Sequence, residues 1–285
     1  MLFTTNDSTV TKGECTATCL ARTVSPEGGA EIVTWELKYP RYIHAELMTH
    51  RMFSRNASSS RATPLSVTIE AVRSNAPFFS KVGLNQPGMV AEKNLEGEEL
   101  ERFKEKWFHL GNIVADYVSD LNKEFGVHKQ VLNRALEPWL YMHAIVTATE
   151  LDNFFHLRLA RDAQPEMQDL AQAMLISMFN QPKVEDTWHF PYREKFAGML
   201  DGPEMISRNV AACARVCVTR HDGTEPSILQ DETLAGQLFE GGHLTPFEHI
   251  AKAGEPDQMY ANFKGWKSYR WMIENNQDIG LKSNG

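Results

Sequence analysis

A short basic segment, residues 41–64, carries side chains suited to binding an anion. It reads RYIHAELMTHRMFSRNASSSRATP, and from Arg41 to Arg61 it holds four arginines against one carboxylate, Glu46. Arginine forks match phosphate oxygens in bidentate fashion, and small hydroxyl groups add donors without steric obstruction. The segment therefore predicts a site for a phosphate-bearing ligand. The alternative is a solvated loop, or an interface whose arginines pair with carboxylates of another subunit.

The charge of the whole chain has the opposite sign. The formal net charge is -8, which argues against a protein that coats nucleic acid or an anionic membrane surface. No segment approaches the roughly 18 continuous apolar residues of a membrane span, and the first residues lack the pattern of a signal peptide. We expect a cytoplasmic protein with a local basic patch.

The four cysteines occur in two pairs, each with three residues between its members. They are Cys15, Cys19, Cys213 and Cys217. This spacing differs from the two-residue spacing of zinc knuckles, so reduced and packed thiols are the simplest interpretation. A metal site or a disulfide is the alternative, and no metal site is included in the prediction.

Hydrophobic periodicity indicates the elements that position this segment. Residues 32–39 alternate apolar and polar side chains, the pattern of a strand with one buried face. Apolar residues from Leu100 to Leu121 recur every three or four positions, which predicts one long amphipathic helix. A second helical stretch covers residues 129–137 and ends near Pro138.

A third helix is expected from Thr147 towards Phe179, with a kink or restart at Pro165 because proline removes a backbone hydrogen bond. Residues 180–206 are rich in Pro, Gly and charge, which indicates a connection rather than core. The tail after Asn275 is polar. The pattern as a whole predicts a mixed α/β (α+β), helix-rich chain that forms a single domain over residues 1–285.

Three segments resemble the motifs of the flavin-dependent thymidylate synthases, also called the thymidylate synthase complementing protein family. The first is His50-Arg51 followed by MFSRNAS, Ser59 and then Arg61. The second is NFFHLRLARDAQPEMQ at residues 153–168. The third consists of ACARVC at 212–217 and GGHLTPFEH at 241–249, which the family carries upstream of the His-Arg motif.

The order of these motifs is that of a circular permutation. Residues 207–250 match the N-terminal part of the family pattern, and residues 30–180 match the rest. Permutation is tolerated where the cut falls in an exposed connection. We therefore expect residues 243–249 to fold beside residues 50–61. Within GGHLTPFEH, Thr245 and Glu248 also have the spacing of a helix capping box.

The resemblance implies an antiparallel-containing sheet flanked by long helices and a homotetramer with shared active sites. It implies FAD as cofactor, NADPH as reductant, and a methyl transfer from methylenetetrahydrofolate, the folate co-substrate, to a pyrimidine deoxynucleotide, dUMP, giving dTMP. The residues that would hold the flavin are His50, Arg51, Asn153, His243, Thr245 and Glu248. Those that would hold the nucleotide are Glu46, Ser59, Ser60, Arg61, Arg134 and Arg158.

Arg158 is the expected catalytic residue, because a fixed cation beside the pyrimidine stabilises negative charge that develops on the base. Its alternative role is a surface ion pair with Asp162, four residues further along a helix, worth a few tenths of a kcal/mol.

Several positions depart from the family pattern. Thr49 replaces an arginine, so one cation is missing unless Arg41 or Arg55 substitutes. Thr147 and Thr149 stand where the family commonly has Asn and Arg, and Asp162 stands in place of a histidine near the flavin. A carboxylate there would disfavour the anionic reduced flavin.

Glu46 stands where the family has a glutamine near the base. A carboxylate only accepts hydrogen bonds, so it could favour a base with an exocyclic amine. A methyl- or hydroxymethyltransferase for a cytosine nucleotide such as dCMP is therefore an open alternative, as is a flavin- or nucleotide-binding protein without turnover. The simpler explanation is that Glu46 pairs with a neighbouring arginine.

Overall fold

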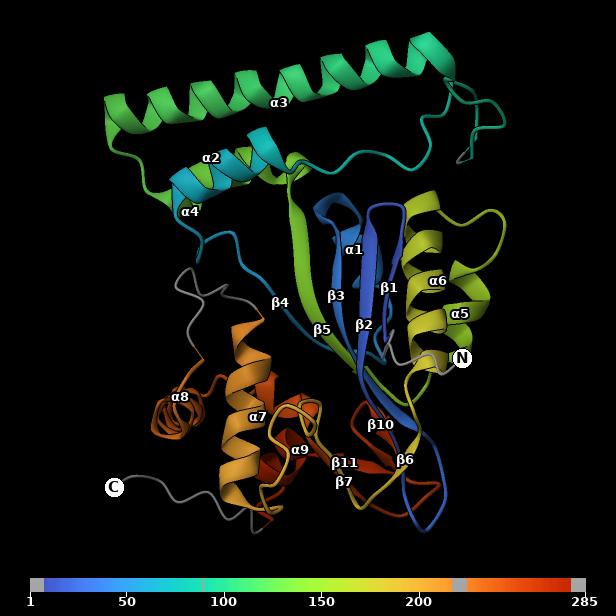
Figure 1. The fold of residues 1–285 in the computed structure, drawn as a ribbon, viewed down its shortest axis with the longest axis vertical. Helices are drawn as coiled ribbons and strands as arrows, with labels where there is room; N and C mark the ends of the chain where they lie inside the picture. Colours follow the sequence, from blue (N-terminus) through green and yellow to red (C-terminus); the bar gives the residue numbers. More distant parts are fainter. Residues whose placement is uncertain (1–7, 89, 217–224, 278–285) are drawn as a thin grey trace, which may run out of the picture.

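A computed structural model describes residues 8–88, 90–216 and 225–277, and it shows helices packed on both sides of a central sheet (Figure 1). The predicted mixed α/β class, with an antiparallel-containing sheet and flanking helices, is confirmed. Within the described residues, no helix has both the length and the apolar character that crossing a membrane requires.

The central sheet brings together strands from residues 9–185. Its strand order is β1-β2-β3-β5-β4, all neighbours are antiparallel, and β6 adds to β2 in parallel. The strands are β1 (Thr9–Lys12), β2 (Cys15–Val24), β3 (Ile32–Pro40), β4 (Ser54–Ala57), β5 (Tyr141–Ala148) and β6 (Val184–Glu185). The basic segment begins directly after β3 with the short helices η1 (Arg41–Ile43) and α1 (His44–Leu47), and it includes β4.

The two central strands show where periodicity works and where it fails. The alternation predicted for residues 32–39 is confirmed in β3, since Trp35, Leu37 and Tyr39 are buried in one core. The expected helix start at Thr147 is wrong, because Thr147 lies in β5. This strand buries Val146 on one face and Ile145 on the other. A strand buried on both faces gives a continuous apolar run that does not distinguish strand from helix.

One face of the sheet is covered by α6 (Pro165–Asn180), with α5 (Asp152–Arg158) beside it (Figure 1). The predicted restart at Pro165 is confirmed, because proline occupies the first turn of α6. Met167, Leu170 and Met174 of α6 are fully buried against the sheet residues. This packing fixes the C-terminal end of α5, where Arg158 lies.

A layer of helices crosses one end of the sheet (Figure 1). It contains α2 (Leu65–Ser74), α3 (Gly97–Phe125), α4 (Lys129–Leu132) and the 3-10 helix η2 (Asn133–Trp139). The predicted long helix and the second helical stretch are confirmed, although most of the latter is a 3-10 helix that includes Pro138. The buried face of α3 is narrower than expected, with Gly111, Ala115 and Val118 in the core and Tyr117 67% exposed.

The C-terminal part packs on the opposite face of the sheet. It contains α7 (Pro203–Arg215), α8 (Ile228–Glu240), the 3-10 helix η3 (Thr245–His249) and α9 (Tyr269–Glu274). Its short strands are β7 (Trp188–His189), β8 (Ala251–Ala253), β9 (Met259–Tyr260), β10 (Phe263–Lys264) and β11 (Trp266–Ser268). Residues 180–206 are more than a connection, since His189, Phe190 and Phe196 are buried in this region.

The cysteines that the structure describes are packed in the interior. Cys15, Cys19 and Cys213 are all buried, and Cys217 lies outside the described residues, as does most of the polar tail. Burial raises the pKa of the Cys19 thiol to about 12, so this thiol stays protonated at neutral pH. A packing role accounts for these side chains.

Candidate active site

Arg158 is the centre of a polar cluster formed by residues far apart in the chain. Its Nε donates a hydrogen bond of 2.8 Å to Nε2 of His50, and Nη2 contacts the Thr49 hydroxyl at 3.3 Å. Nη1 forms an ion pair with the carboxylate of Glu46. The side chain of Arg158 is only 17% exposed, so its guanidinium is held in one orientation. The alternative pairing with Asp162 is therefore wrong.

His50 acts as an acceptor in this cluster. Because the Arg158 guanidinium can only donate, Nε2 of His50 must be unprotonated and the ring proton lies on Nδ1. Burial, and then the charges of Arg158 and Arg55, lower the pKa of His50 to about 4. Its ring lies edge-on to Phe154, with centroids 4.8 Å apart. At neutral pH His50 is therefore a neutral side chain that orients Arg158.

Arg55 and Arg41 are held by partners other than the Thr49 side chain. Arg55 donates from Nη1 to the backbone carbonyls of Leu47, Met48 and His50, and so closes the loop before β4. Arg41 is 3.0 Å from the carboxylate of Glu137 and lines a different cavity. The cation that contacts the Thr49 side chain is Arg158.

A cavity of about 800 Å³ lies beside this cluster. It brings together three predicted flavin-binding residues, His50 and Arg51 from the loop and Asn153 from α5. The charged side chains on its wall are two cations, Arg51 and Lys264, and three carboxylates, Glu150, Asp152 and Asp257, of which Asp257 is 3.4 Å from Lys264. Lys264 lies in the hairpin of β9 and β10. The backbone N–H of Lys264 donates a hydrogen bond of 2.9 Å to the Thr149 hydroxyl. The wall therefore offers both cations and acceptors.

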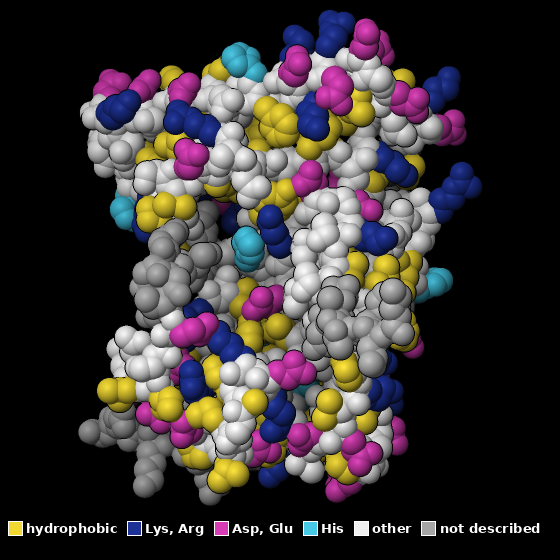
Figure 2. Space-filling model, in the orientation of Figure 1, with side chains coloured by type: hydrophobic (Ala, Val, Ile, Leu, Met, Phe, Trp, Pro, Cys, Tyr) yellow, Lys and Arg dark blue, Asp and Glu magenta, His cyan; other side chains and the backbone are white. Residues whose placement is uncertain are grey.

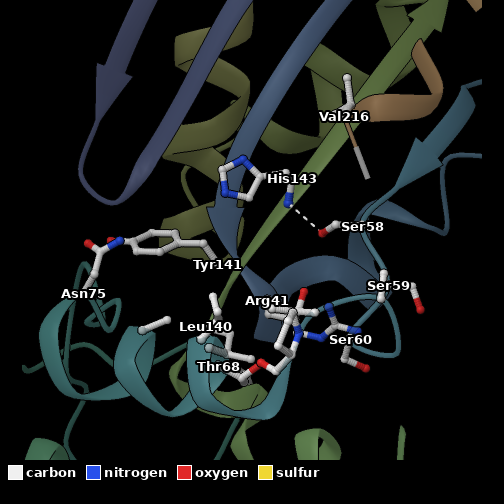
Figure 3. A pocket seen from close by; sticks show the side chains of 15 residues that line it. Arg41, Ser58, Ser59, Ser60, Thr68, Asn75, Leu140, Tyr141, His143 and Val216 are labelled. Carbon is white, nitrogen blue, oxygen red and sulfur yellow. Dashed lines mark hydrogen bonds between the residues drawn. The ribbon is translucent and has the colours of Figure 1, made fainter. Parts of the chain in front are cut away.

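A second cavity, of about 230 Å³, lies between α2 and the ends of β4 and β5 (Figure 3). It contains the predicted nucleotide-binding residues Ser59 and Ser60, together with Arg41. The loop at Ser58 is fixed on β5, because the backbone N–H of His143 donates to the Ser58 hydroxyl at 3.2 Å. In the space-filling view, this side of the molecule is hollowed between the α2–α3 layer and the α7–α8 pair (Figure 2).

Other predicted residues do not line either cavity. Arg61, Arg134 and His243 are exposed, and Asp162 is exposed too. Their roles in ligand binding stay predictions.

The motif near the C-terminus packs where the permuted order predicts. η3 lies against β4, so residues 243–249 are beside the basic segment as expected. The capping-box prediction is wrong, because η3 is a 3-10 helix without a side-chain cap and the carboxylate of Glu248 is 2.6 Å from Arg270. Burial lowers the pKa of Arg55, and the nearby carboxylate of Glu248 partly offsets this shift.

Nothing in the sequence indicated a buried chain of hydrogen bonds that joins the central sheet to β7 and to η3. Thr34 contacts Nε2 of His189 at 2.7 Å and the hydroxyl of Thr147 at 2.6 Å, and Thr147 contacts Nδ1 of His249 at 2.9 Å. All four side chains are fully buried. Threonines on a strand give no sequence signal for such partners, although His249 does close the GGHLTPFEH motif.

These histidines predict how stability depends on pH. Burial lowers the pKa of both His189 and His249 to about 3, against about 6.5 in an unfolded chain. Between about pH 6 and pH 4 the unfolded chain therefore binds protons that the folded protein does not. The free energy of unfolding should fall with falling pH, by about 1.4 kcal/mol per pH unit for each histidine.

Urea denaturation at several pH values checks this slope. His249→Gln should reduce the slope by about 1.4 kcal/mol per pH unit, whatever the stability of the variant at pH 7. The exposed His156 provides the matched control, since His156→Gln should leave the slope unchanged. An unaltered slope in His249→Gln would contradict the assignment.

The fold and site define a helix-flanked antiparallel sheet protein with an arginine–histidine cluster beside the larger of two cavities. The family model of the thymidylate synthase complementing protein matches residues 30–180. This match covers half of the chain, and the chain belongs to that family, the flavin-dependent thymidylate synthases. Residues 207–250 lie outside the match, so their permuted origin stays a prediction.

Solved structures give a weaker likeness. Two crystal structures of thymidylate synthase X from Helicobacter pylori, each with FAD and dUMP, match at 23% and 24% identity. In both, the match covers 52% of this chain and 67% of that chain, with a TM-score of 0.35. No curated protein matches the chain.

Proposed function

We propose that this enzyme transfers a one-carbon unit from methylenetetrahydrofolate to C5 of dUMP and so forms dTMP, with FAD as cofactor and NADPH as reductant. The observation that supports this most is the cluster in which Arg158 is fixed by Glu46, Thr49 and His50. The family match to residues 30–180 covers every member of this cluster.

The larger cavity fits a flavin cofactor. Its volume of about 800 Å³ is within the usual range for small-molecule sites, roughly 300–1,000 Å³. Arg51 and Lys264 suit phosphates, whereas Glu150 and Asp152 suit hydroxyl groups. His50, Arg51 and Asn153 would hold the cofactor, and Thr245, Glu248 and His243 complete the set proposed from the motifs. The flavin, when bound, supplies the hydride chemistry.

Arg158 supplies the charge for the reaction at the base. Its guanidinium is fixed by three partners, so little reorganisation is needed when negative charge develops on the pyrimidine. Glu46 partly balances this cation, and His50 stays neutral because its pKa is about 4. We therefore assign Glu46 and His50 to orienting Arg158.

The nucleotide phosphate is assigned to Ser59, Ser60, Arg61 and Arg134. Arg61 and Arg134 are exposed in the single chain, which suits a homotetramer whose active sites are completed by neighbouring subunits. α3 supplies a surface for such contacts, with Leu110, Ile113 and Tyr117 between 45% and 67% exposed on one side. A light-scattering mass of one chain would contradict the shared sites.

The alternative substrate dCMP receives less support from the geometry. The carboxylate of Glu46 is paired with Arg158, so it is already engaged by a cation. The pairing is of the kind that the simpler explanation of Glu46 expected, although the arginine is distant in sequence. We therefore propose uracil as the base. A cytosine nucleotide or a hydroxymethyl product would be the result that favours the alternative.

A spectroscopic experiment tests the proposed cofactor and reductant. The protein should bind FAD, and NADPH should bleach the flavin absorbance. Adding methylenetetrahydrofolate and dUMP anaerobically should then restore the oxidised spectrum. Bound FAD that is reduced but never reoxidised by both substrates together would contradict the reaction, and failure to bind FAD would contradict the cofactor.

A further inference from the structure

Arg41 has a position in the smaller cavity that the proposed reaction does not use. It is the first residue of η1, and its backbone N–H donates to the carbonyl of Leu140 at 2.8 Å. Its side chain is 17% exposed, and Nη2 is 3.0 Å from the carboxylate of Glu137. Among the described residues that line this cavity, Arg41 is the only Lys or Arg, and none is a carboxylate.

Hydroxyl groups are most of the other polar side chains on this wall, which also contains apolar residues such as Ala62, Val67 and Leu140. Ser58, Ser59 and Ser60 lie on one side, and Thr63 and Thr68 are further lining residues (Figure 3). Within the described part of the chain, neither the Ser60 hydroxyl nor the Thr63 hydroxyl is hydrogen-bonded to another residue, and only their backbone carbonyls accept bonds from Asn133. Such groups can donate to an anion at little cost, since no internal bond is lost.

Hydrogen bonds to its backbone carbonyls hold in place the loop that carries these hydroxyls. Asn133 is fully buried, and its Nδ2 donates to the carbonyls of Ser60 at 2.7 Å and Thr63 at 3.0 Å. Lys129 adds a hydrogen bond of 2.9 Å to the carbonyl of Ala62. The wall is therefore formed before any ligand binds, which reduces the entropy lost on binding.

We propose that Arg41 binds the phosphate of a phosphate monoester in this cavity, together with the hydroxyls of Ser59 and Ser60. A guanidinium beside several hydroxyl donors, with no carboxylate on the wall, matches a phosphate group. The volume of about 230 Å³ is below that of most whole-ligand sites and suits the phosphate end of a larger molecule. The identity of the monoester as the pyrimidine nucleotide rests on the proposed function.

Glu137 has a definite role in this proposal. Carboxylate and phosphate oxygens compete for the same guanidinium donors, and Glu137 is bound to Arg41 at 3.0 Å without lining the cavity. Removing its charge should therefore release Arg41 towards the phosphate. If the ion pair were only structural, Glu137→Gln would weaken dUMP binding as Arg41→Gln does, because loss of either partner would destabilise the fold.

Isothermal titration of dUMP, deoxyuridine and inorganic phosphate tests the assignment in the whole protein. Arg41→Gln should weaken dUMP binding about 10- to 100-fold and abolish competition by inorganic phosphate. Glu137→Gln should strengthen dUMP binding severalfold. Deoxyuridine, which lacks the phosphate, should bind both variants as it binds the unaltered protein. Arg41→Lys should fall between Arg41→Gln and the unaltered protein.

Other outcomes overturn the proposal. Unchanged dUMP affinity in Arg41→Gln would exclude Arg41 as a phosphate ligand, and equal losses for dUMP and deoxyuridine would indicate a damaged fold. Weaker dUMP binding in Glu137→Gln would also contradict it. If the unaltered protein binds no dUMP, the proposed function fails, yet phosphate binding that depends on Arg41 would still support the cavity assignment.

Discussion

Replacing Arg158 with glutamine is expected to lower kcat for dTMP formation about 100- to 1,000-fold. The affinity for dUMP should change much less, because the charge that Arg158 meets develops mainly in the transition state. In the structure the guanidinium is 17% exposed and contacts Glu46, Thr49 and His50. Steady-state kinetics together with dUMP titration separate the two effects.

A neighbouring arginine provides the control for this substitution. Arg161 is exposed three residues further along, so Arg161→Gln should leave kcat within about twofold. Arg158→Lys keeps the charge and loses the fork that spans the three partners, so it should recover part of the rate. If Arg158→Gln lost dUMP affinity as strongly as kcat, the residue would be a binding group and the catalytic assignment would be wrong.

Replacing Asp231 with alanine is expected to cost about 3–5 kcal/mol of the free energy of unfolding. Asp231 of α8 is 1% exposed and pairs with two arginines of α7, Arg208 at 3.1 Å and Arg215. Its removal leaves two cations, 17% and 20% exposed, without their shared carboxylate. Arg215 belongs to the ACARVC motif, so that motif holds α7 and α8 together.

Urea denaturation measures this loss, and Asp201 is the matched control. Asp201 pairs with Arg193 at 2.7 Å but is 35% exposed, so Asp201→Ala should cost less than about 1 kcal/mol. A loss below about 1 kcal/mol in Asp231→Ala would show that the two arginines find other partners or water.

How much of the fold the sequence predicts depends on which faces of each element are buried. β3 was predicted because its buried residues alternate with more polar ones, and α6 because Pro165 marks its first turn. β5 was mistaken for helix, since side chains on both of its faces are buried. Residues 180–206 have the composition of a loop, yet His189 finds buried partners on β2 and β3.

The sequence predicted the candidate site only in part, because some of its residues meet only in the folded protein. Motif resemblance identified His50, Arg51 and Asn153, which the fold brings to one cavity. It did not identify the partners of Arg158, because Glu46 and His50 reach it from more than 100 residues away in sequence. The role of Arg41 was equally hidden, since its cavity forms only when α2 packs near β5.

The mass of the product tests the central claim most directly. Purified enzyme is incubated with FAD, NADPH and methylenetetrahydrofolate, and with either dUMP or dCMP, and the nucleotides are analysed by mass spectrometry. The account predicts that dUMP gains one CH₂ unit to give dTMP and that dCMP is unchanged. A hydroxymethylated product, a product from dCMP alone, or no product in the presence of bound and reduced flavin would contradict it.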